Sequence, residues 1–144
     1  MKLVLYVSHK TTPWPSDAKD IEDITTVALS RNAALRVTGV LISTDFYFAQ
    51  ILEGPSAAVD EIMASILRDC RHHHLEVLAD RKQPKRWFPN WSLAFAGRSS
   101  PLAAHIEPSL AQPPKTPKEI EWLLLLMRAL VRPVPGHSYD DLGG

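Results

Sequence analysis

Two strand-like segments lie almost next to each other near the middle of the chain, at 37–44 (VTGVLIST) and 46–53 (FYFAQILE). Both are rich in the β-branched, aromatic and aliphatic residues that favour strands. Because only Asp45 separates them, the pattern predicts a tight antiparallel hairpin. The rest of the chain therefore has to fold around a β-sheet that contains this hairpin.

The second of these segments carries a polar side chain among hydrophobic ones. Because side chains alternate along a strand, one face is predicted to hold Phe46, Phe48, Gln50 and Leu52. An amide in such a position must find partners for its two donors and its acceptor, since leaving such a group unpaired costs about 1–3 kcal/mol. The pattern therefore predicts that another side chain, a water molecule or a buried polar ligand forms hydrogen bonds with Gln50.

Other apolar patterns complete an α+β fold. Segments with strand or helix periodicity lie at 2–8, 16–32, 56–70, 75–80 and 91–97. The resulting order, βαββαββ, matches the ferredoxin-like pattern in its first six elements, with two helices on one face of the sheet. In that topology the first and third strands are central neighbours, so Tyr6 and Gln50 can share the side that faces the helices.

The C-terminal part is predicted to add one more helix. Residues 98–116 contain four prolines and are expected to be a connector, whereas 117–132 follow a strong helix start and are apolar nearly all round. One side of this helix is expected to cap the bare face of the sheet, and the 117–131 stretch to meet a second copy of the chain in a dimer. Residues 133–144 are expected to be a loose tail.

Composition and charge exclude several classes of function. The 16 Lys and Arg residues balance the 16 Asp and Glu residues, so no net charge favours nucleic acid or an acidic membrane as a partner. No apolar run is long enough to span a bilayer, and the N-terminus does not resemble a signal peptide. With a single cysteine, Cys70, these features predict a soluble cytoplasmic protein without disulfides.

Uncharged polar residues near the first helix leave two interpretations open. Asn32 lies near the predicted end of that helix, where Asn is common as a cap. A cleft between the two helices would instead bring Asn32 together with Gln50 and Tyr6, and such a slot suits a flat heteroaromatic ligand. The pattern by itself favours the plainer alternative, a hydrogen bond between Tyr6 and Gln50 inside an ordinary core.

Charged and histidine residues follow the second helix. Asp69, Arg71 and His72 either complement the helix dipole or form a polar mouth for the sugar or phosphate tail of a ligand. The run His72–His74 does not predict a metal site, because neighbouring side chains on a strand face opposite sides. No Ser, Cys or carboxylate pair forms a catalytic unit, so no enzymatic activity is predicted.

Five motifs in order make the chain resemble the BLUF domain, a blue-light sensor that uses FAD. They are LYVS around Tyr6, SRNAALRVTGVL around Asn32, FAQILEG around Gln50, RDCRHHHLEVL after the second helix, and RWFPNWSLAF around Trp91. The similarity covers residues 2–97 and implies a flavin-binding domain at 1–97, of the short stand-alone type. The cofactor implied is FAD, with FMN or riboflavin as alternatives.

The resemblance also implies roles for single residues. Cofactor contacts are implied for Tyr6, Ile24, Arg31, Asn32, Phe48, Gln50, Ile66, Asp69, Arg71 and His72. Tyr6 would be the electron and proton donor to the excited flavin, Gln50 the hydrogen-bond relay to the ring, and Asn32 the partner of its pyrimidine edge. The signal would then pass through Trp91 and Leu93 to a dimer interface or to an unknown partner protein.

Two positions depart from the family pattern. Leu93 stands where the family usually has a methionine, and Ser65 stands where relatives often have a basic residue near the flavin tail. Arg31 or Arg68 is expected to compensate for Ser65. Two other functions remain open: a flavin-free ferredoxin-like module for ligand binding or interaction, and, less favoured, a small flavin enzyme.

Overall fold

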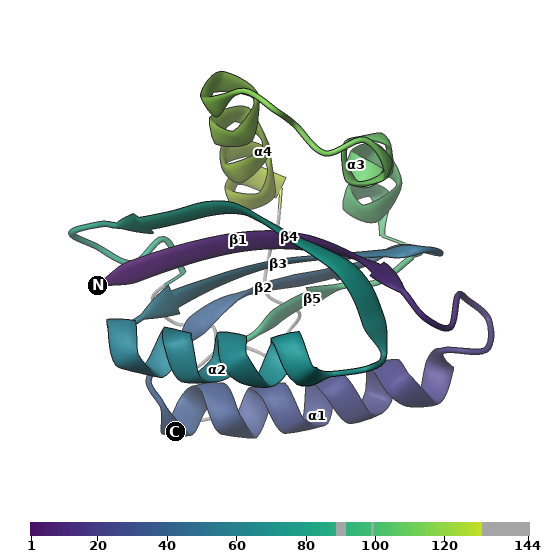
Figure 1. The fold of residues 1–144 in the computed structure, drawn as a ribbon, viewed down its shortest axis with the longest axis horizontal. Helices are drawn as coiled ribbons and strands as arrows, with labels where there is room; N and C mark the ends of the chain where they lie inside the picture. Colours follow the sequence, from purple (N-terminus) through teal and green to yellow (C-terminus); the bar gives the residue numbers. More distant parts are fainter. Residues whose placement is uncertain (89–91, 99, 131–144) are drawn as a thin grey trace.

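The structure, a computed structural model, describes residues 1–88, 92–98 and 100–130. Its elements are β1 (Lys2–Lys10), α1 (Ala18–Ala34), β2 (Thr38–Ser43), β3 (Tyr47–Gly54), α2 (Ser56–Arg68), β4 (His72–Lys82), β5 (Ala94–Ala96), α3 (Pro101–Ala111) and α4 (Pro117–Leu130). Figure 1 shows one sheet with α1 and α2 on one face and α3 and α4 on the other. The predicted α+β, ferredoxin-like fold is confirmed, while the predicted tail at 133–144 lies outside the described residues.

The sheet has the strand order β4-β1-β3-β2-β5. Its neighbouring strands are antiparallel, except that β5 runs parallel to β2. β1 and β3 are neighbours at the centre, as predicted, and Tyr6 lies directly opposite Gln50 in their register. Two side chains that are 44 residues apart in the sequence therefore meet on the face that α1 and α2 cover.

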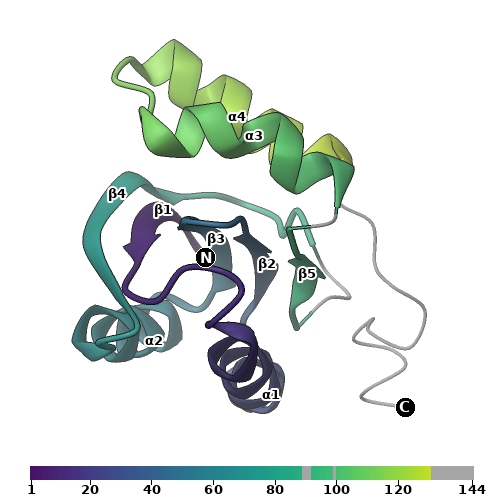
Figure 2. The same cartoon turned by 90° about the vertical axis from the view of Figure 1, so that its right-hand side faces the viewer.

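The opposite face of the sheet carries the larger core. Leu123, Leu124 and Met127 of α4 are buried there together with Ile106 and Leu110 of α3, and Figure 2 shows both helices lying across that face. Burial of one such large side chain contributes about 1.5–3 kcal/mol. The prediction that a C-terminal helix caps this face is confirmed.

The segment at 98–116 is more regular than the predicted connector, because it contains α3. Pro101 stands at the first helical position, where the missing N–H costs nothing, and Pro108 removes only one backbone hydrogen bond. Ile106 and Leu110, four residues apart, bury one side of the helix against the sheet. The high proline content of the segment hid this apolar stripe.

The five predicted strands all differ in their bounds from those in the structure. β2 ends at Ser43 and β3 begins at Tyr47, and Thr44 closes the turn through its hydroxyl, which accepts a hydrogen bond from the Tyr47 N–H at 3.1 Å. Phe46 therefore lies in the turn and is 54% exposed, so its predicted place on the apolar strand face is wrong. The last strand is also shorter than predicted, since β5 covers only the middle of 91–97.

The sheet face beneath α1 and α2 has two separate small cores. One lies under α2 and includes Val4, Leu52 and Ile62, and the other lies under α1 around Leu41 and Leu93. Because the two clusters do not merge, the space between the helices is not filled by a continuous core. This gap is the position of the functional site.

Candidate functional site

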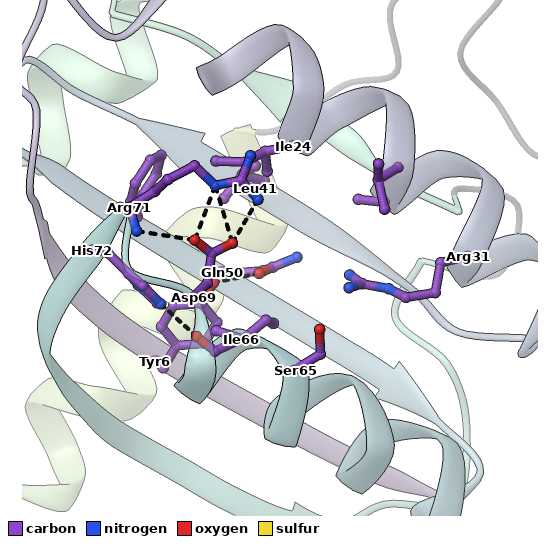
Figure 3. Close-up of a pocket in the computed structure, with 13 residues that line it drawn as sticks. Tyr6, Ile24, Arg31, Leu41, Gln50, Ser65, Ile66, Asp69, Arg71 and His72 are labelled. Atoms are coloured by element: carbon purple, nitrogen blue, oxygen red, sulfur yellow. Dashed lines mark hydrogen bonds and ion pairs between the residues drawn. The ribbon is translucent and has the colours of Figure 1, made fainter. Parts of the chain in front are cut away.

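A pocket opens between α1 and α2, over the middle of the sheet (Figure 3). Its apolar lining comes from both helices and from the strands below, and includes Ile24, Val27, Leu41, Phe48 and Ile66. The sequence pattern of α1 explains part of this lining, because Ile24, Val27 and Arg31 recur at helical spacing and share one face. Apolar walls combined with a few converging polar side chains are typical of sites that bind small molecules.

Tyr6 and Gln50 lie together at the floor of the pocket. The Tyr6 hydroxyl donates a hydrogen bond of 2.5 Å to Gln50 Oε1, and each residue is only 4% exposed. Burial raises the pKa of Tyr6 well above its ordinary value, so the phenol stays protonated and remains a donor. The predicted Tyr6–Gln50 pair is therefore present, and it borders a pocket rather than a closed core.

Asp69 and Arg71 form an ion pair at the pocket, directly after the end of α2. The Arg71 guanidinium donates to both carboxylate oxygens of Asp69, with its shortest contact at 2.6 Å, and the Arg71 backbone N–H donates to Oδ1 at 2.9 Å. Hydrogen bonds from Arg71 hold the pKa of Asp69 below its ordinary range. The pair is thus held in one arrangement (Figure 3).

Arg31 projects from the last turn of α1 towards the pocket (Figure 3). It is half-buried, and its Nε is a buried donor without a hydrogen-bond partner in the described part of the chain. Burial lowers the pKa of this guanidinium. A buried, unpartnered N–H beside an apolar slot fits a bound molecule that carries carbonyl or phosphate oxygens, as a flavin nucleotide does.

Asn32 does not line the pocket. It is fully buried, and its Nδ2 donates a hydrogen bond of 2.9 Å to the Ser92 carbonyl. The alternative that Asn32 caps the first helix is wrong, because α1 continues to Ala34 and Leu35 is its C-cap. In the structure Asn32 therefore ties α1 to the segment that leads into β5.

The remaining predicted site residues divide into three groups. Ser65 and His72 line the pocket, whereas Arg68 is exposed and does not. Leu93 is buried beside Phe48 in the cluster under α1. Trp91 lies outside the described residues.

The histidine run does not alternate as a regular strand would. His74 has a left-handed φ of 52°, and this turns its ring towards His73, with 4.6 Å between the ring centroids. The expectation that these two side chains face opposite sides is therefore wrong. Across 1–88, 92–98 and 100–130, no group of three or more His, Cys, Asp or Glu residues is arranged to hold a metal ion.

Comparisons with known proteins identify the family and the fold of this chain. The sequence profile of the family described as "BLUF: Sensors of blue-light using FAD" matches residues 1–94. The photoactivated adenylate cyclase subunit alpha of Euglena gracilis is 30% identical over 93 residues, which is 65% of this chain and 9% of that protein. The blue light- and temperature-regulated antirepressor BluF of Escherichia coli (strain K12) is 35% identical over 85 residues, 58% of this chain and 21% of that protein.

Solved structures show the same fold. The dark-state structure of the BLUF protein BlrB has a TM-score of 0.76 and 26% identity, covering 89% of this chain and 95% of that one. The photo-activated state of BlsA has a TM-score of 0.78 at 22% identity, covering 93% and 99%. None of the described helices is long and apolar enough to cross a membrane. The match of the family profile over residues 1–94 shows that the chain belongs to the BLUF family, the blue-light sensors that use FAD.

Proposed function

We propose that this chain binds its flavin in the pocket between α1 and α2, and that the Tyr6–Gln50 hydrogen bond is the part of the protein that responds to light. The observation that carries this proposal is the position of the bond, at the floor of the pocket and in reach of a ligand there. FMN and riboflavin are alternative ligands, because the pocket's apolar walls suit the ring that all three flavins share.

Side chains around the pocket supply apolar walls for a flat ring and hydrogen-bond donors for its polar atoms. Ile24 on α1 and Ile66 on α2 supply apolar walls for the ring, and Phe48 adds a third from β3. Arg31 supplies N–H donors for a carbonyl or phosphate oxygen and takes the place of the basic residue missing at Ser65. Asp69 and Arg71 then lie beside the ribityl chain and the phosphates, with His72 next to them.

Light acts on the protein through proton movement between two side chains. A bound flavin absorbs blue light and is a strong oxidant while it is excited. Tyr6 would give an electron to the excited flavin, which would make its phenol strongly acidic, and the proton would then move along the hydrogen bond to Gln50 Oε1. Gln50 carries both donors and an acceptor, so its amide can rotate or tautomerise and present a different partner to the pocket.

The return to darkness reverses these steps. The electron and the proton both go back to Tyr6, and no covalent bond to the protein has formed. The two hydrogen-bond arrangements are therefore two states of one system, whose populations light shifts.

The change at Gln50 reaches β5 through packed neighbours. Leu93 contacts the same cluster as Phe48, and the adjoining Ser92 carbonyl is held by Asn32. A shift of the ring or of Gln50 moves this cluster, and Trp91 is the second member of the proposed relay. Asn32 would thus anchor the segment that leads into β5.

Signal output is proposed to use α4, either in a dimer or with a partner protein. Its outer side exposes two large apolar residues, Trp122 at 56% and Leu125 at 48%. The relatives named above are a cyclase and an antirepressor, so sensors of this family serve different outputs. We assign this chain no catalytic step of its own, and we place it in the cytoplasm.

The absorption spectrum before, during and after blue illumination tests the proposal. Flavin bands that shift slightly to the red and recover in darkness are the expected result. Tyr6→Phe should bind flavin and show no shift, because only the phenolic O–H is removed. A shift that persists in this variant would contradict the role of Tyr6.

A flavin-free interaction module is the second candidate function. The observation in its favour is that Tyr6 and Gln50 already satisfy each other by a direct bond. A purified protein that is colourless and does not take up added FAD, FMN or riboflavin would support it. Oxidation of NAD(P)H by the flavin-loaded protein would instead indicate an enzyme.

A further inference from the structure

His72 has a hydrogen bond on each of its ring nitrogens. Nδ1 lies 2.8 Å from Ser8 Oγ on β1, and Nε2 lies 2.7 Å from the Ile66 carbonyl oxygen. Ile66 belongs to the last turn of α2, and its carbonyl oxygen also accepts a hydrogen bond of 3.1 Å from the backbone N–H of the C-cap residue Asp69. The imidazole therefore joins the end of α2 to the central strand β1.

The chemistry of these partners fixes where the protons lie. A backbone carbonyl can only accept, so Nε2 must carry the hydrogen. In a neutral imidazole Nδ1 is then an acceptor, and the Ser8 hydroxyl must be its donor. Ser8 is only 1% exposed, so this hydroxyl has little access to solvent as an alternative partner. His72 consequently has no free N–H for a phosphate while it is neutral.

The same ring packs against the residue that is proposed to respond to light. The centroids of His72 and Tyr6 are 6.1 Å apart, with an interplanar angle of 64°, and those of His72 and Phe48 are 6.2 Å apart at 78°. Both are edge-to-face contacts, which fix the relative orientation of aromatic rings. Tyr6 and Ser8 also project from the same face of β1, two residues apart.

We propose that Ser8 and His72 form a positioning pair, in which Ser8 fixes the ring of His72 and His72 orients the Tyr6 phenol towards Gln50. The inference rests on the proposed function, because orientation of Tyr6 matters only if its hydroxyl takes part in the light response. The pair stabilises the arrangement in which Tyr6 donates to Gln50. Its removal therefore slows the return to that arrangement in darkness.

The first test is ¹⁵N NMR of the His72 imidazole in the wild-type protein at neutral pH. The expected result is a hydrogen on Nε2 and an Nδ1 that accepts a hydrogen bond. A neutral ring with its hydrogen on Nδ1, or exchange between the two tautomers, would overturn the pair. This measurement needs no light response, so it is independent of the proposed function.

The second test is the rate of dark recovery in Ser8→Ala. The red shift should keep its size while recovery slows about fivefold, as expected for one lost hydrogen bond. The matched control is Ser43→Ala, since Ser43 is also a buried strand serine and does not line this pocket. Equal recovery rates in Ser8→Ala and the wild type would overturn the proposal.

A double-mutant cycle separates positioning from general destabilisation. His72→Leu removes the acceptor for Ser8 together with the donor for the Ile66 carbonyl, while His73→Leu serves as the exposed neighbour control. In the His72→Leu background, Ser8→Ala should have no further effect on recovery. Additive effects would overturn the pair. A wild-type protein that binds flavin but shows no red shift would overturn the proposed function, and the NMR result would still decide the tautomer.

Discussion

At the scale of single residues, the pocket depends on groups whose chemical state is set by burial. Tyr6 is kept protonated because the desolvated phenolate would be costly. Arg31 keeps a buried N–H without a partner among the described residues, and Asp69 is held ionised by Arg71. The site therefore combines a protonated phenol donor, a guanidinium whose Nε–H has no partner among the described residues, and a neutralised ion pair.

The raised pKa of Tyr6 predicts how light sensitivity depends on pH. The size of the red shift should stay constant from pH 8 to about pH 10, the ordinary tyrosine value, because the folded protein keeps its phenol protonated. The stability of the fold, in contrast, should depend on pH. Above about pH 10 the unfolded chain releases the Tyr6 proton and the folded chain does not, so the free energy of unfolding falls as the pH rises. Absorption spectra and urea unfolding across this range check both trends. Loss of the red shift in a still folded protein below pH 10 would contradict the prediction.

Arg31 and Arg68 differ in what they are predicted to do for flavin binding. Arg31→Met should weaken FAD binding about tenfold or more, because a charged hydrogen bond in the pocket is lost. Arg68→Met is the matched control, since Arg68 is exposed and outside the pocket, and it should change the affinity little. Titration of flavin fluorescence measures both. An equal loss of FAD affinity in the two variants would show that the phosphate tail of the flavin is held by the overall positive charge of the region and not by Arg31 specifically.

At the scale of elements, one buried carboxylate holds the segment between β4 and β5 in place. Glu53 on β3 is fully buried and accepts hydrogen bonds from the backbone N–H groups of Trp87 and Phe88, the Gln83 amide and the Thr38 hydroxyl. These partners come from β2 and from the loop that leads towards the proposed relay. The Glu53 carboxylate has no contact with solvent, and these four hydrogen-bond donors stabilise it in place of water.

Glu53→Gln is predicted to destabilise the fold by about 2–4 kcal/mol. The amide nitrogen of glutamine would face N–H donors where an acceptor is needed. Glu61→Gln, at an exposed position of α2, is the control and should be near neutral. Urea unfolding measures the stability of both variants, and the two are compared at the same slope of the free energy of unfolding against urea concentration. A Glu53→Gln midpoint equal to that of the control would rule out the anchoring role.

At the scale of the whole molecule, α4 has one side in the core and one side free for an interaction. Leu124 is fully buried whereas its neighbour Leu125 is 48% exposed, and Trp122 is 56% exposed. The balanced charge of the chain, with 16 basic and 16 acidic residues, puts no long-range repulsion in the way of self-association.

Two neighbouring leucines on α4 therefore separate folding from association. Leu124→Ala should cost about 2–5 kcal/mol of stability, while Leu125→Glu should leave the monomer folded and abolish the proposed dimer. Light scattering in darkness and under blue light measures association, and urea unfolding measures stability. A wild-type protein that is monomeric in both conditions would refute the dimer and leave a partner protein as the output.

Much of the fold and part of the site were readable from the sequence. The strand-forming residues of 37–44 and 46–53, with only Asp45 between them, predicted the hairpin. Helical spacing located α1 and α2, because it reflects which side of each helix is apolar. The pairing of Tyr6 with Gln50 followed from the topology that this order permits. The motifs around those residues also pointed to the family.

Other features needed the tertiary structure, because they depend on contacts between distant segments. Asn32 bonds to Ser92 rather than lining the pocket, and α3 forms within a proline-rich stretch because Ile106 and Leu110 find a sheet to cover. His72 acquires its partners Ser8 and Ile66 only when three elements meet. The sequence by itself determined which side chains are apolar and approximately where α1, α2, α4 and the strands lie, since those are local properties. Only the tertiary structure decided which polar groups form hydrogen bonds with each other, since a hydrogen bond requires two atoms to be brought within about 3 Å.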